Sequence, residues 1–280
     1  MTIFSSTYGY DDVIVPFLRQ MSQLKKLTLS FTIEYRTSFI DGTELYNNVL
    51  IKMKNLELFV FDIVVASTDT SIDNPQSCVA IQGTFNEMGY NVNCYLNDTT
   101  SAKIGRCHVY SLPFNFEYMQ PIDNNFLGSR FVTVRILTIQ DYYRSFEHEF
   151  FLGISQSFPF LTSLEIVNQR KQKKIHTNLI AEYGEKTLII VFPHLAAIRF
   201  RMSSKDYLEQ LLHDKKTYLP ALRQLDVPYE HLQIITNNFT HHSTHRNCAK
   251  LEYIRMVSAP VVFPKDFYHY FPSLNKKLLC

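Results

Sequence analysis

Three histidines and one cysteine lie close together in the segment 241–248, namely His241, His242, His245 and Cys248. Imidazole and thiolate groups are ligands that zinc prefers, so this spacing is what a metal-dependent hydrolase would need. Cys248, however, occupies an apolar position of a repeated pattern, so we expect its sulfur to be buried beside Leu251. No second closely spaced ligand pair completes the set, which favours a solvated loop. We therefore predict no metal and no cofactor, and keep a metal-dependent hydrolase as the weakest alternative.

Two other groups of neighbouring residues have the types needed for acid–base or nucleophilic chemistry. Glu147-His148-Glu149 places two carboxylates beside an imidazole, but residues two apart in a helix point to different sides. Cys107 and His108 are adjacent, and neighbours in a strand project to opposite faces, so we expect the cysteine in the core and the histidine in solvent. The sequence contains no phosphate-binding Gly-x-x-x-x-Gly-Lys, no Gly-x-Gly-x-x-Gly and no Gly-x-Ser-x-Gly. These patterns predict that the protein is not an enzyme.

Composition limits the classes of partner. The 28 Lys and Arg residues nearly balance the 26 Asp and Glu residues, so the chain has no overall field that would hold nucleic acid or an anionic membrane. A basic run such as 170–174 is found in nucleic-acid contacts and localisation signals, and also in solvated loops between repeats. The balanced charge favours the loop, so nucleic-acid binding is kept as an alternative function.

The cysteines and the first thirty residues predict a compartment. Five scattered cysteines without a Cys-x-x-Cys pair argue against a disulfide framework and against a structural zinc module. Asp11 and Asp12 interrupt the first thirty residues, which contain no long apolar block, so no secretory signal is expected. The most apolar stretches are shorter than the ~20 residues that a membrane helix needs. We predict a cytoplasmic or nuclear protein that does not bind a membrane.

The apolar residues follow one repeated pattern, Φ-x-x-Φ-x-x-Φ-x-Φ, in which Φ is an apolar residue. Seven copies fit it, and an eighth, Ile104-Cys107-Tyr110-Leu112, is weaker. Most successive copies lie 27 to 34 residues apart, at or just above the about 20 to 29 residues of leucine-rich repeats. One longer step holds either an insertion at 67–103 or a degenerate repeat. The second apolar positions are Leu24, Leu56, Cys107, Val134, Leu161, Leu195, Leu222 and Leu251.

The intervals between these copies have helical spacing of apolar residues, and Thr43 and Ser204 are among the expected helix caps. Each helix–strand unit has an apolar face that it cannot bury alone, so the units stack and share a core. We predict an α/β fold, an irregular leucine-rich-repeat solenoid with parallel strands on the concave side and helices on the convex side. It would form a single domain over 1–280 with about eight units. An ordinary doubly wound α/β domain is the alternative.

Two copies resemble the "FPxLxxLxL" units of F-box and leucine-rich-repeat proteins, namely 158–166 (FPFLTSLEI) and 192–195 (FPHL). The resemblance covers the apolar repeat positions from about residue 11 to residue 275. It implies the substrate-recognition region of a ubiquitin-ligase receptor, with ubiquitin-ligase components as partners if an F-box lies upstream. No F-box is visible, so the chain is a fragment or a member that has lost it. The asparagine expected three residues after the last apolar position is also missing, which predicts irregular turns.

Strand alternation defines the surface that we expect to bind a protein partner. If the repeat positions face the core, the residues between them face outward. Arginine and tyrosine are residue types that supply interface anchors, and Arg199, Arg201 and Arg255 would form a basic patch for an acidic segment of the partner. The sequence therefore predicts a protein-binding repeat scaffold. The candidate partner-binding residues are Lys26, Asp62, Glu165, Arg199, Arg201, Asp226, Tyr253 and Arg255.

Overall fold

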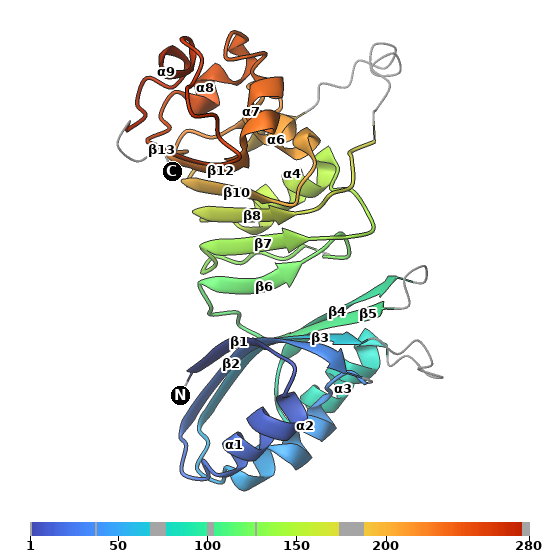
Figure 1. Cartoon of the computed structure of the whole chain (residues 1–280). Coiled ribbons are helices and arrows are strands. Elements are labelled where there is room, and N and C mark those ends of the chain that lie inside the picture. Colours follow the sequence, from blue (N-terminus) through green and yellow to red (C-terminus); the bar gives the residue numbers. More distant parts are fainter. Residues whose placement is uncertain are drawn as a thin grey trace, which may run out of the picture. The chain divides into compact units, whose positions relative to one another are not determined.

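The computed structural model describes residues 2–36, 38–67, 77–99, 104–126, 128–173 and 188–275 (Figure 1). The chain divides into two compact units. Unit 1 is Met1–Asn115 with Asn125–Leu127, and unit 2 is Phe116–Asn124 with Gly128–Cys280. Each unit combines helices with a sheet that contains parallel strands, and neither described sheet closes into a barrel. The mixed α/β class is thus confirmed, whereas a single repeat domain over 1–280 stays a prediction.

Unit 1 is built on a five-stranded sheet in the order β1-β2-β3-β5-β4. The first three strands pair in parallel, but β5 is antiparallel to both β3 and β4. The weak eighth copy of the motif lies in β5, so the parallel repeat strand expected there is wrong. The strands are β1 (Thr2–Thr7), β2 (Lys26–Arg36), β3 (Leu58–Ser67), β4 (Val92–Thr99) and β5 (Ile104–Ser111).

The helices of unit 1 lie on one side of its sheet (Figure 1). Their apolar residues form one cluster with the strands, in which Leu18, Leu45 and Phe85 are almost fully buried. Asp41 rather than the expected Thr43 caps α2, because its side chain accepts a hydrogen bond from the backbone N–H of Glu44 at 2.8 Å. The helices are a π-helix (Tyr10–Ile14), α1 (Val15–Arg19), α2 (Gly42–Asn48), a 3-10 helix (Leu50–Lys52) and α3 (Cys78–Glu87).

The expected insertion at 67–103 is described in part. Its described residues form α3 and β4, while residues 68–76 and 100–103 lie outside the described ranges. Whether this region is an insertion or a degenerate repeat therefore stays open. Its strand β4 extends the sheet through antiparallel pairing with β5, a pairing that the repeat pattern does not predict.

Unit 2 is built on a six-stranded, fully parallel sheet in the order β13-β12-β10-β8-β7-β6. Five of these strands carry the repeat motif where it was expected, and β6 was not predicted. The third and fourth apolar positions of each motif are buried, as Leu164 and Ile166 of β8 illustrate. The strands are β6 (Tyr118–Ile122), β7 (Ile136–Gln140), β8 (Ser163–Val167), β10 (Ala197–Arg201), β12 (Gln224–Pro228) and β13 (Tyr253–Val257).

The segments between these strands carry the helices of unit 2. Ser204 caps α6 as expected, because its hydroxyl accepts from the backbone N–H of Asp206 at 3.3 Å. The short strands β9 (Ile190–Val191) and β11 (Thr217–Tyr218) pair in parallel with each other. Among the described residues of unit 2, the helices are α4 (His148–Ser157), α6 (Lys205–Leu212), α7 (Tyr229–Ile235), a 3-10 helix (His242–Thr244), α8 (His245–Cys248) and α9 (Phe267–Tyr270).

Copies of the motif in both units open with the same backbone turn. The carbonyl of the first apolar residue accepts a hydrogen bond from the N–H of the second, three residues later. This turn gives the spacing Φ-x-x-Φ its physical reason, since it brings both apolar side chains to one end of the strand that follows. The paired residues are Met21 and Leu24, Met53 and Leu56, Phe158 and Leu161, Leu219 and Leu222, and Cys248 and Leu251.

Buried polar residues follow β7 and β8, two positions after the last apolar residue of each motif. Asp141 accepts hydrogen bonds from the backbone N–H groups of Tyr143 and Arg144 at 2.9 Å each. Asn168 donates to the Arg144 carbonyl at 2.7 Å and accepts from the Arg170 N–H at 2.8 Å. These side chains satisfy turn backbone as a ladder asparagine would, but one position earlier than the expected offset.

We expect Asn168→Ala to lower the free energy of unfolding by about 1–3 kcal/mol, because the Arg144 carbonyl and the Arg170 N–H lose a fully buried hydrogen-bonding partner. Urea unfolding of the variant measures the loss. Asn86→Ala, an exposed substitution in α3, is the control and should change stability by less than about 0.5 kcal/mol. Equal stability of the two variants would show that Asn168 does not support the turn.

Candidate functional site

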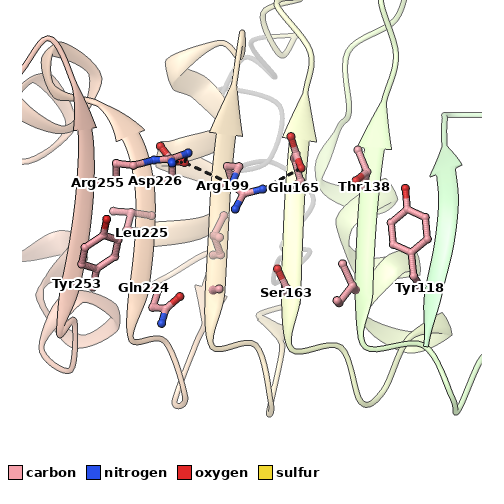
Figure 2. Close-up of a pocket in the computed structure, with 13 residues that line it drawn as sticks. Tyr118, Thr138, Ser163, Glu165, Arg199, Gln224, Leu225, Asp226, Tyr253 and Arg255 are labelled. Carbon is pink, nitrogen blue, oxygen red and sulfur yellow. Dashed lines mark hydrogen bonds and ion pairs between the residues drawn. The ribbon is translucent and has the colours of Figure 1, made fainter. Parts of the chain in front are cut away.

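The parallel register of unit 2 aligns its outward side chains in two rows. Strand residues alternate between buried and exposed, so every second residue of β7, β8, β10, β12 and β13 faces away from the core. Figure 2 shows these rows along adjacent strands. We call this surface the strand face. Its first row is Tyr118, Ile136, Ser163, Ala197, Gln224 and Tyr253, and its second row is Thr138, Glu165, Arg199, Asp226 and Arg255.

The second row alternates in charge and is linked by ion pairs (Figure 2). Arg199 lies between two carboxylates, with Nη1 3.4 Å from Glu165 Oε2 and Nε 3.3 Å from Asp226 Oδ2. Arg255 Nε donates to Asp226 Oδ2 at 2.9 Å, and this hydrogen bond raises the pKa of the Arg255 guanidinium. Arg201, two residues after Arg199, reaches Glu165 Oε1 at 3.1 Å. The arginines are therefore held in place by their neighbours.

Arginines and carboxylates of the strand face differ in exposure. The side chains of Arg199, Arg201 and Arg255 are 52%, 61% and 54% exposed, whereas those of Glu165 and Asp226 are 17% and 15% exposed. The carboxylates thus lie beneath the guanidinium groups. The guanidinium groups are therefore the more exposed of the charged groups on the strand face.

A hollow lies on the strand face and is lined by residues of both rows, including Glu165, Arg199, Asp226 and Arg255. Ser163 and Ala197 have the smallest side chains of the first row, and larger ones flank them, with Ile136 on one side and Gln224 and Tyr253 on the other. The hollow has a volume of about 350 Å³. This size is near the lower end of the range of about 300–1,000 Å³ for ligand pockets, so it suits one or two side chains of a partner.

Six of the eight predicted partner-binding residues lie on the sheet of unit 2, and the other two lie in unit 1. Lys26 is the exposed first residue of β2. Asp62 is in β3 and is fully buried, so the outward exposure expected from alternation is wrong for it. Neighbouring Ile63 and Val64 are both fully buried too, which shows that β3 is covered on both of its faces.

Asp62 belongs to a buried polar group that the sequence did not indicate. Its Oδ1 lies 2.5 Å from His108 Nε2, and His108 Nδ1 lies 2.8 Å from the Tyr95 hydroxyl. His108 is fully buried, so the expectation that it faces solvent is wrong. Cys107 is buried as expected. The register explains both contacts. Tyr95 on β4 is directly opposite His108 on β5, and Asp62 is two residues before Val64, the residue of β3 that is opposite His108.

The other candidates for acid–base chemistry make separate hydrogen bonds. Glu147 Oε1 accepts from the Ser145 hydroxyl at 2.5 Å and from the Lys173 N–H at 3.1 Å. His148 Nε2 lies 2.9 Å from the Leu188 carbonyl. These bonds tie the loop segments to α4, and they engage the two side chains with different partners. In the basic run 170–174, Lys174 lies outside the described residues.

The histidine-rich segment has its cysteine in the core. Cys248 is fully buried, and desolvation raises the pKa of its thiol to about 12. His241 Nδ1 lies 2.7 Å from the Ser243 hydroxyl. Across the described ranges, no three His, Cys, Asp or Glu side chains are grouped so that they could hold a metal ion.

We expect the Cys248 thiol to resist alkylation by N-ethylmaleimide near neutral pH in the folded protein, because it is buried and protonated. Mass spectrometry of the peptide that contains Cys248 measures the labelling. The same peptide from protein denatured in guanidinium is the control and should be labelled completely. Rapid labelling of the folded protein would place the sulfur at the surface, near the histidines.

Comparison with known proteins found no matching family model, no matching curated protein and no matching solved structure. Within the described part of the chain, no helix is long and apolar enough to cross a membrane. The argument for function therefore depends on the strand face and on the residues that form it.

Proposed function

We propose that the protein is a protein-binding repeat scaffold and that its partner docks on the strand face. One observation carries the proposal, namely that five adjacent strands in register hold exposed arginines, a tyrosine and a hollow on the same surface. Arginine and tyrosine dominate the binding energy of protein interfaces. The acids that hold Arg199 and Arg255 reduce the side-chain entropy that binding would cost.

We also propose that the repeats build an irregular leucine-rich-repeat solenoid. The common opening turn of the motif copies and the parallel, in-register strands of unit 2 support this. In such a fold each unit buries its apolar face against the next, and the exposed strand residues form one continuous binding surface.

The resemblance of segment 158–166 to F-box and leucine-rich-repeat units supports a narrower role. In that role the chain is the substrate-recognition region of a ubiquitin-ligase receptor in the cytoplasm or nucleus. The strand face would hold the protein to be modified, and no cofactor would be needed.

Removal of the guanidinium groups tests the proposal. We expect the combined change Arg199→Gln, Arg201→Gln and Arg255→Gln to abolish capture of the native partner in a pull-down from cell extract. The melting temperature should change little, because the three arginine side chains are more than half exposed and each of their ion pairs contributes about 0–1 kcal/mol.

The matched control changes three exposed arginines away from the strand face, Arg130, Arg144 and Arg246, to glutamine. This variant should capture the partner as the unchanged protein does. Undiminished capture by a well-folded strand-face variant would contradict the proposal. Unfolding of that variant would contradict it too, since the arginines would then be structural.

A further inference from the structure

The exposed groups of the strand face specify the chemistry of a partner. A guanidinium has five N–H donors, and the ion pairs of Arg199 engage its Nη1 and Nε atoms. Donors therefore remain for another anion. Carboxylates match the fork geometry of arginine, and arginines that are already held in place lose less entropy when they bind one. The strand face is thus suited to carboxylate groups of a partner.

The apolar part of the hollow's lining, which includes Ile136, Ala197, Ile198 and Leu225, offers room for an apolar side chain next to the arginines. Ala197 precedes Arg199 by two residues on β10, which corresponds to about 6.8 Å along the strand. An extended peptide covers the same distance in two residues. A side chain seated in the hollow would therefore place a carboxylate two residues later beside Arg199.

A second carboxylate has a partner at a similar distance. Arg255 lies two strands away from Arg199, since β12 separates β10 and β13. Arg199 Nε and Arg255 Nε lie 3.3 Å and 2.9 Å from the same oxygen, Asp226 Oδ2, so the two guanidinium groups are closer together than the two strand spacings of about 9.6 Å. Arg255 and Arg199 both contact Asp226, so their guanidinium groups lie on the same part of the strand face.

We propose that the strand face binds an extended acidic peptide segment in which an apolar side chain fills the hollow and one or two carboxylates two to five residues away contact Arg199 and Arg255. This inference rests on the proposed function and names the chemistry of its partner. Nucleic acid is the less favoured anion, because the strand face has little net charge and the positive and negative charges of the whole chain nearly balance. The charged side chains of the strand face sum to a single positive charge, and they are Glu165, Arg199, Arg201, Asp226 and Arg255.

Selection from a phage-displayed library of random 12-residue peptides on the immobilised full chain tests the inference. We expect enriched peptides to contain an apolar residue followed within about five residues by Asp or Glu. Synthetic copies should bind about tenfold or more weakly to Arg199→Gln/Arg255→Gln and to Ala197→Phe, which fills the hollow. Arg130→Gln/Arg144→Gln should bind them normally, and thermal melting checks that each variant is folded.

Each other outcome overturns the inference in a distinct way. Enriched peptides that lack acids but lose binding to Ala197→Phe would refute the acidic chemistry and leave the proposed docking surface standing. Peptides unaffected by either strand-face variant, or no enrichment at all, would refute the inference and move docking elsewhere. Salt-sensitive binding of a single-stranded oligonucleotide that requires Arg199, without peptide enrichment, would replace the peptide by nucleic acid.

Discussion

Replacing His108 with alanine is expected to lower the free energy of unfolding by about 3–5 kcal/mol. The ring is fully buried and contacts the Asp62 carboxylate and the Tyr95 hydroxyl. The alanine variant leaves Asp62 and Tyr95 without their hydrogen bonds to His108, and it leaves a cavity between β3, β4 and β5. Urea unfolding measures the loss, provided that the free energy of unfolding has the same dependence on urea concentration in both proteins.

Two further variants separate the hydrogen bonds from the packing. His108→Gln retains a donor and an acceptor of similar length and should lose less stability than the alanine variant. His269→Ala, an exposed change in α9, should cost less than about 0.5 kcal/mol. If His108→Ala were as harmless as the His269 control, the buried polar group would have no part in stabilising unit 1.

Leu161→Ala and Leu222→Ala are each expected to cost about 2–5 kcal/mol, because both leucines are almost fully buried at the turn that opens a repeat strand. The cost combines lost apolar burial with the cavity that remains. Thermal or urea unfolding measures it.

Leu188→Ala is the matched control for these changes, since Leu188 is 66% exposed. It removes the same atoms from the surface and should cost less than about 0.5 kcal/mol. A loss below that value at both Leu161 and Leu222 would mean that the repeat register read from the sequence is wrong.

The repeat pattern predicts strands well and strand direction less well. Apolar residues at alternate positions mark one buried face, and this is why β2, β3, β7, β8, β10, β12 and β13 were found. The same alternation fits an antiparallel strand, so it cannot distinguish the antiparallel β5 from a parallel repeat strand. Alternation also assumes that the second face is exposed, which fails for β3, where Asp62 and Val64 are buried.

The sequence predicts which residues form the candidate site but not which of them form ion pairs with one another. Alternation correctly placed Arg199 and Arg255 on the outward face. Their ion pairs with Asp226 depend on which strands are neighbours and on their register, which no single strand's sequence contains. Asn168 was missed for a simpler reason, because the turn after β8 places the buried polar residue one position earlier than the family offset.

Site-specific photo-crosslinking tests the docking surface most directly. A benzophenone amino acid in place of Tyr253, an aromatic residue that lines the hollow, should form a covalent adduct with the captured partner in cell extract. The same group in place of Gln233, which is on α7, should form no such adduct. Adducts from position 233 without any from position 253 would contradict the account and place the partner on the helices.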